Sequence, residues 1–180
     1  GSLVTAAGTT TTVHDGDVVY TAGDSLLMGG AAAATGNGSL TLTAANSVTQ
    51  NASLSTAGTG SVTATAATGS LTMGAGSGTT VGTGNVTYLA GDSLSVNEIT
   101  TATGGAGGNV TLTAATGALI DVNGAAVNVI ANNLTTNYAT GEAAELNSTD
   151  FLQGLIGATN PPPNLILFEN RILGGASMDP

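Results

Sequence analysis

Apolar and small polar residues alternate with a period of two in five short segments of the chain. In the third segment Val62, Ala64 and Ala66 occupy alternate positions, and Thr63 and Thr65 lie between them. This alternation is typical of a β-strand with one buried face, because successive side chains of a strand point to opposite sides. The abundant Thr, Val and Gly also disfavour a helix. The five segments begin at Asp17, Ser39, Ser61, Asn85 and Asn109.

These segments are equivalent parts of an internal repeat, because their starts lie 22 to 24 residues apart. Each is followed by a turn rich in Gly, Asn, Asp, Thr and Ser, and then by an apolar residue. The apolar residues after the turns are Leu26, Val48, Leu71, Leu94 and Leu119. No unit can bury its own apolar face, so successive units must stack, each strand pairing with its equivalent one repeat later. The pattern predicts an all-β, single-domain parallel β-helix (β-solenoid) with coils of about 22–24 residues.

Stacking in register would place equivalent side chains in columns along the rod. Three inward columns are predicted: Val18, Leu40, Val62, Val86 and Val110; Tyr20, Leu42, Ala64, Tyr88 and Leu112; and Ala22, Ala44, Ala66, Ala90 and Ala114. Glycine in the spacers permits the positive φ that sharp corners need. At ~4.8 Å per coil, five or six coils would form a rod roughly 25–30 Å long.

The chain is predicted to have two parts. Residues 1–140 form the solenoid, with an irregular lead-in coil at 1–16 and the repeats from 17 onward. Residues 141–180 form a C-terminal cap and latch, with a short helix within 142–157, a proline linker at 161–163 and a hydrophobic tail. The tail would cover its own solenoid or pair with a neighbouring copy by strand addition. Its apolar residues are Leu165, Ile166, Leu167, Phe168, Ile172 and Leu173.

Composition restricts the partners. Of the 180 residues 41% are apolar but only 3% are aromatic, which indicates a thin core of small side chains. Arg171 is the only cation against eleven acids, so the chain cannot neutralise nucleic acid or an anionic membrane. No apolar run approaches the ~20 residues of a membrane span, and no signal peptide is visible, so we expect a mature chain or an excised segment. The absence of cysteine excludes disulfides and thiolate metal sites and is compatible with export.

The ionisable residues do not predict an enzyme, a cofactor or a metal site. Paired acid–base catalysis needs two carboxylates in one cleft, whereas Asp24 and Asp92 are equivalent positions three coils, or roughly 14 Å, apart. Asp15, Asp17 and the Gly-Asp-Ser turns offer oxygen ligands for calcium, but too few for its six to eight contacts, and turn chemistry accounts for them. Asp121 is one more scattered carboxylate. His14, the only histidine, has no nucleophile motif around it and is expected to be a surface residue of the lead-in coil.

Threonines recur at outward positions of the repeat. Stacking would arrange them in two columns, which contain Thr41, Thr63, Thr87 and Thr111, and Thr43, Thr65 and Thr113. A flat Thr-x-Thr face on a solenoid resembles an ice-binding surface, and it could also hold a glycan. Threonine is equally an ordinary residue of exposed strands.

The segments Gly-Ser-Leu-Thr-Leu-Thr-Ala (38–44) and Gly-Gly-Asn-Val-Thr-Leu-Thr-Ala-Ala-Thr-Gly (107–117) resemble repeats of filamentous-haemagglutinin-type adhesins, which are two-partner-secretion or autotransporter passengers. The resemblance covers about residues 17–135. It implies a right-handed β-helix on the bacterial cell surface or outside the cell, acting as stalk, fibre or adhesive surface. The partners would be the protein itself, as a longer solenoid or homopolymer, or a host or surface glycan or protein. A polysaccharide-active β-helix enzyme is the remaining alternative.

Overall fold

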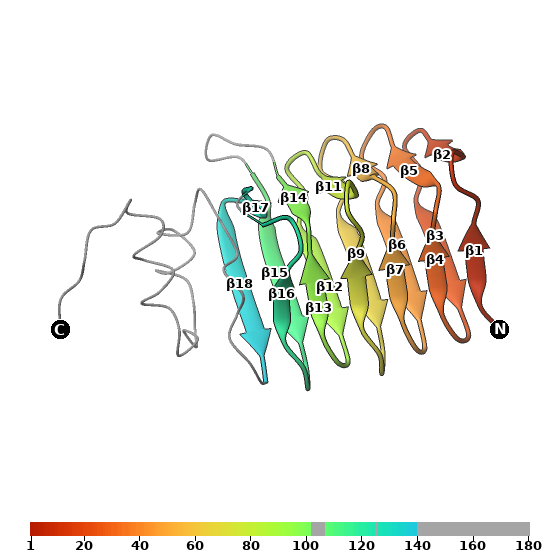
Figure 1. Cartoon of the computed structure of the whole chain (residues 1–180). Helices are drawn as coiled ribbons and strands as arrows, with labels where there is room; N and C mark the ends of the chain where they lie inside the picture. The colour runs from red at the N-terminus through yellow and green to blue at the C-terminus, as the bar shows by residue number, and fades with distance from the viewer. Residues whose placement is uncertain (102–106, 125, 140–180) are drawn as a thin grey trace, which may run out of the picture.

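The computed structural model of the chain describes residues 1–101, 107–124 and 126–139. They form three six-stranded sheets, and all neighbouring strands that pair are parallel. Each coil gives one strand to each sheet, and six coils stack from β1 at one end to β18 at the other (Figure 1). None of the described residues is helical, and this part of the chain accordingly contains no helix able to cross a membrane. The predicted all-β parallel solenoid is confirmed here.

Sheet C contains the five predicted strands and one more. Its strands are β3 (Val18–Ala22), β6 (Leu40–Ala44), β9 (Val62–Ala66), β12 (Val86–Ala90), β15 (Asn109–Ala114) and β18 (Asn133–Tyr138). The register pairs Val62 with Val86 and Ala66 with Ala90, and it stacks all three predicted inward columns in the same way. Every member of these columns is buried except Tyr20, which is half-buried in the first coil. The predicted columns are therefore confirmed.

Sheet A begins where the chain resumes after each turn. Its strands are β1 (Leu3–Thr5), β4 (Leu26–Met28), β7 (Val48–Gln50), β10 (Leu71–Met73), β13 (Leu94–Val96) and β16 (Leu119–Asp121). The apolar residues predicted after the turns form one buried column, in which Leu26, Val48, Leu71, Leu94 and Leu119 are paired in sequence. Sheets A and C therefore carry most of the large apolar side chains of the core.

Sheet B, the third side of each coil, was not predicted. Its strands are β2 (Thr10–Val13), β5 (Ala31–Ala34), β8 (Leu54–Thr56), β11 (Gly78–Thr80), β14 (Glu98–Thr100) and β17 (Val129–Ile130). One inward column runs through Ala32, Leu54, Thr79, Ile99 and Val129. These positions are 20 to 30 residues apart, so this side of the coil lacks the regular period of the other two.

Residues 1–16, expected as an irregular lead-in, contain two regular sides of the first coil. Leu3 pairs with Leu26 in sheet A, and Thr10 pairs with Ala31 in sheet B. Backbone hydrogen bonding to the second coil extends these two sheets through residues whose side chains, apart from Leu3, Val4 and Val13, are short or polar. The first coil is therefore regular in its backbone although its sequence lacks the alternating pattern.

A column of polar side chains marks the corner that leads into sheet C. Asp17 Oδ1 accepts a hydrogen bond from Ser39 N (2.8 Å), and Ser39 Oγ accepts one from Ser61 N (3.1 Å). Ser61 Oγ then accepts from Asn85 N (3.1 Å), and Asn85 Oδ1 accepts from Asn109 N (2.9 Å). Each coil thus supplies a side-chain acceptor for a backbone donor of the next coil, which satisfies N–H groups at the corner.

The residue before each rung of this polar column is glycine for a steric reason. From the second coil onward, a Cβ atom on each of these glycines would collide with the carbonyl oxygen of the glycine one coil earlier, so backbones of successive coils meet directly. The colliding pairs are Gly38 with Gly16, Gly60 with Gly38, Gly84 with Gly60, and Gly108 with Gly84. At these positions glycine is therefore required by close backbone approach, whereas the predicted positive φ angles occur at other glycines of the turns, such as Gly58 and Gly76.

A closed ring of hydrogen bonds lies inside the otherwise apolar core. Tyr88 Oη donates to Gln50 Oε1 (2.7 Å), Gln50 Nε2 donates to Thr79 Oγ1 (3.1 Å), and the Thr79 hydroxyl completes the ring to Tyr88 Oη (2.5 Å). The three residues come from β7, β11 and β12, one from each sheet, and all are buried. Burial raises the pKa of Tyr88, and its hydrogen bonds with Thr79 and Gln50 act in the opposite direction.

The expected cap, proline linker and hydrophobic tail at 141–180 lie outside the described residues.

Candidate functional site

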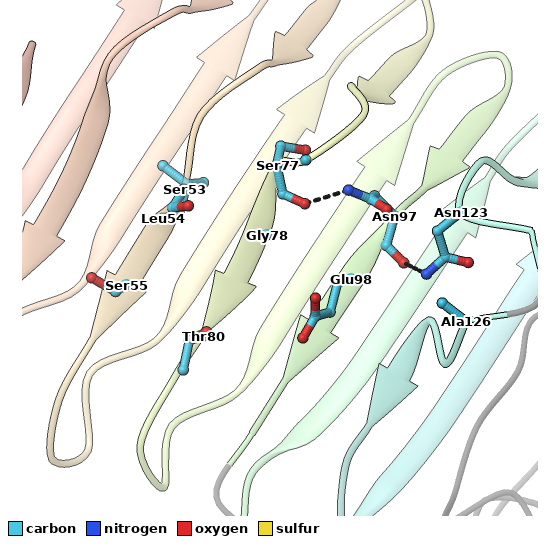
Figure 2. A pocket seen from close by; sticks show the side chains of 11 residues that line it. Ser53, Leu54, Ser55, Ser77, Gly78, Thr80, Asn97, Glu98, Asn123 and Ala126 are labelled. Atoms are coloured by element: carbon cyan, nitrogen blue, oxygen red, sulfur yellow. Dashed lines mark hydrogen bonds between the residues drawn. The ribbon is translucent and has the colours of Figure 1, made fainter. Parts of the chain in front are cut away.

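The outer side of sheet B carries a groove of about 360 Å³, which we call the sheet B groove. Figure 2 shows its lining residues on β8, β11 and β14, in the turns just before these strands, and in the loop after β16. The small side chains of β8 and β11 leave the space, and Glu98 of β14 extends beside it. The groove is lined by Ser53, Leu54, Ser55, Gly76, Ser77, Gly78, Thr80, Asn97, Glu98, Asn123 and Ala126.

Two asparagines fix one wall of the sheet B groove. Asn97 Nδ2 donates to Ser77 O (2.5 Å), and Asn123 Nδ2 donates to Asn97 O (2.8 Å), so the walls of three successive coils are joined (Figure 2). Their amide donors are thereby occupied by backbone carbonyls. Asn123 Oδ1 is buried and has no hydrogen-bond partner, so it is also shielded from a ligand in the groove.

The chemistry of the sheet B groove is that of one carboxylate among hydroxyl groups. Among the lining residues that the structure describes, Glu98 is the only ionisable one. Hydroxyls and a carboxylate can accept and donate hydrogen bonds to a polar ligand. The groove was not predicted, since it depends on sheet B; the Ser- and Gly-rich spacers were the signal for it.

The predicted threonine columns lie on the outer side of sheet C. The pairing register stacks Thr41 on Thr63, Thr63 on Thr87 and Thr87 on Thr111. In the second column Thr43 pairs with Thr65, and Leu89 stands between Thr65 and Thr113. All seven predicted threonines are exposed or half-exposed. The structure therefore brings these side chains together in two adjacent rows, which we call the threonine face.

The described aspartates are spread over the corners and strand ends of the coils. Asp15 Oδ1 accepts a hydrogen bond from Asn37 N (3.2 Å), and Asp92 Oδ2 accepts one from the Ser70 hydroxyl (3.2 Å). Asp121 Oδ1 accepts from Asn123 N (2.8 Å) and from Asn128 Nδ2 (3.0 Å). These contacts, with that of Asp17 described above, are turn and corner contacts of the kind predicted for aspartate.

Asp24 and Asp92 occupy the same corner of different coils, as the repeat predicted. Backbone hydrogen bonds connect them one coil at a time, from Asp92 to Gly69, from Gly69 to Asn46 and from Asn46 to Asp24. The side chains of Asn46 and then Ser2 donate to the Asp24 carboxylate and lower its pKa.

His14 lies on the surface of the first coil. Its Nε2 is 3.3 Å from Asp15 Oδ2, and its Nδ1 is 3.2 Å from Thr35 Oγ1. No group of three His, Cys, Asp or Glu side chains suited to a metal ion occurs within residues 1–101, 107–124 and 126–139. The predicted self-association residues all lie outside the described part of the chain; they are Leu165, Ile166, Leu167, Phe168, Ile172 and Leu173.

The comparisons add no relative to this description. No protein-family model matches the chain, no curated protein matches it, and no solved structure matches it.

Proposed function

We propose that the chain is a non-enzymatic structural segment of an extracellular bacterial surface fibre or adhesin. The observation that carries the proposal is the in-register stacking of six coils in three continuous parallel sheets. The hydrogen bonds between strands run along the stack, so extension of the rod would require the breaking of many of them together. Such a rod suits a stalk that holds a binding surface away from the cell.

The strands at the two ends of the stack support a role in assembly. Within the described residues, β1, β2 and β3 pair on one side only, and so do β16, β17 and β18. Unpaired strand edges are templates for further pairing. Such an edge could continue into further coils of a longer adhesin, or it could join a second copy of this chain.

The hydrophobic tail is the proposed latch of a homopolymer. Leu165 to Phe168 with Ile172 and Leu173 form the most apolar cluster of the sequence, and such a segment can add to a sheet edge of a neighbouring copy. The resemblance of the repeats to filamentous-haemagglutinin-type coils supports export and an adhesive or fibrous role.

Negative-stain imaging and sedimentation of the purified full chain test this proposal. Under the homopolymer hypothesis the full chain forms filaments that lengthen with concentration, and deletion of residues 161–180 abolishes them. Leu167→Asp should have the same effect, because a charge at a strand-pairing interface would be desolvated. Asn164→Asp, which adds the same charge beside the cluster, is the control and should leave filaments intact.

The outcomes separate the possibilities. Filaments that persist after the deletion would show that the solenoid ends associate without the tail. Short rods at every concentration, for all variants, would favour a stalk segment and reject the homopolymer. Globular or unfolded particles would reject the rod itself and with it the structural role.

A further inference from the structure

The outer side of sheet C is a regular array of uncharged side chains. Twelve of its strand positions form two columns that the register pairs coil by coil, and Asn109 and Asn133 lie beside them at one edge of the sheet. The first column contains Val19, Thr41, Thr63, Thr87, Thr111 and Thr135, and the second contains Thr21, Thr43, Thr65, Leu89, Thr113 and Asn137. Nine of the twelve are threonine, and none is charged or aromatic. In a chain of net charge −10, this neutral side differs from the corners, where the aspartates lie.

The hydroxyl groups of these threonines are free for an outside partner. Hydrogen bonds within the described part of the chain engage other threonines, such as Thr56 and Thr68, but none engages the nine on this face. Their β-branched side chains have restricted χ1 angles, and the stacked neighbours in each column hold them further. The face therefore presents hydroxyl and methyl groups in a fixed pattern.

The sheet sets the dimensions of this pattern. Adjacent coils lie ~4.8 Å apart, and two threonines separated by one residue on a strand lie ~6.6 Å apart. A water molecule bound by each hydroxyl would repeat with the same two spacings, which are of the order of the oxygen repeats on the planes of an ice crystal. The methyl groups would lie against the same surface and lose contact with bulk water.

The composition of the face favours ordered water over a sugar chain. Saccharide sites are expected to contain aromatic rings for stacking and a few well-placed amides or carboxylates. The two columns have no ring, no carboxylate and one amide, Asn137, and the amides of Asn109 and Asn133 at the edge of the face are hydrogen-bonded to each other. We infer that the threonine face binds ice. The inference is independent of the proposed structural function, because a rod that forms no filament would still carry this face.

Ice-crystal shaping and thermal hysteresis of the full chain test the inference. Thr63 lies at the centre of the first column, paired with Thr41 and Thr87, so Thr63→Tyr should abolish shaping through the bulk of the ring. Leu89, which is 39% exposed, interrupts the second column, and Leu89→Thr should increase thermal hysteresis because it completes that column. Tyrosine and threonine both suit exposed strands, so neither change should unfold the rod.

Thr72→Tyr is the matched control. Thr72 is half-exposed on the outer side of β10 in sheet A, between Thr49 and Ser95, and its replacement should leave ice shaping unchanged. Circular dichroism and thermal melting confirm the fold of each variant. Absence of shaping by the unaltered chain would overturn the inference, as would equal losses in Thr63→Tyr and Thr72→Tyr. Retention on chitin or cellulose without ice shaping would instead identify the face as a polysaccharide surface.

Discussion

Removal of the Tyr88 hydroxyl should destabilise the rod through the ring that it completes. Tyr88→Phe keeps the buried ring of carbon atoms but leaves Gln50 Oε1 without the donor at 2.7 Å, and the Thr79 hydroxyl without its acceptor. A buried polar group that loses its partner costs about 1–3 kcal/mol. We therefore expect Tyr88→Phe to lower the free energy of unfolding by about 1–3 kcal/mol, measured as a lower urea midpoint at an unchanged slope.

The same substitution should be harmless once the rest of the ring is apolar. Gln50 stacks between Met28 and Met73 in sheet A, so Gln50→Met continues an existing column, and Thr79→Val keeps the shape of Thr79. This double variant will itself be less stable, because Gln50 Nε2 also donates to the carbonyls of Ala52 and Gly78. In that background Tyr88→Phe should be neutral or stabilising, since no partner of the hydroxyl remains.

The difference between the two backgrounds is the coupling free energy of the ring. A loss that is equal in both backgrounds would refute the reasoning, because the effect of Tyr88→Phe would then not pass through Gln50 and Thr79. A loss of well under about 0.5 kcal/mol in the unaltered chain would refute it too, since an unpaired buried acceptor costs more than that.

Two further predictions concern the corners and the buried phenol. Gly60→Ala should destabilise the rod by about 1–3 kcal/mol, because the added Cβ collides with Gly38 O. Gly78→Ala should be tolerated, because a Cβ there lies no closer than 3.8 Å to Glu98 O. Urea unfolding measures the stability of both variants, and equal losses of stability would contradict the steric account. The pKa of Tyr88 is raised in the folded state. The neutral phenol therefore contributes its full stabilisation below the unfolded pKa of about 10. As the pH rises above that value, the free energy of unfolding falls by up to about 1.4 kcal/mol per pH unit. Tyr88→Phe should flatten the decline in stability above this pH, and an unchanged slope would contradict the predicted shift.

The columns of sheets A and C were predictable because the residues there are large, apolar and regularly spaced. Val62, Val86 and Val110 recur at 24 residues, and a change of one position would turn each strand's buried face outward. Hydrophobic burial alone was therefore enough to predict the register. The threonine columns followed from the same register, since they occupy the alternate positions.

Sheet B and its groove could not be predicted in this way. Its inward positions include Ala32 and Thr79, which carry little hydrophobic signal, and the step from Ile99 to Val129 is longer than the repeat. The strands form because neighbouring coils already hold the backbone in place. The ring of Gln50, Thr79 and Tyr88 was missed for a related reason, since it depends on which side chains of three different sheets meet in the interior.

The three corners of the coil differ in how much their lengths vary, and this has an evolutionary consequence. Three or four residues separate each strand of sheet C from the next strand of sheet A, whereas one to seven separate sheet A from sheet B and two to eight separate sheet B from sheet C. Insertions and deletions are therefore tolerated around one side, while the opposite corner keeps the coils aligned. New surface features, and with them new specificities, can arise beside sheet B without disturbance of the scaffold.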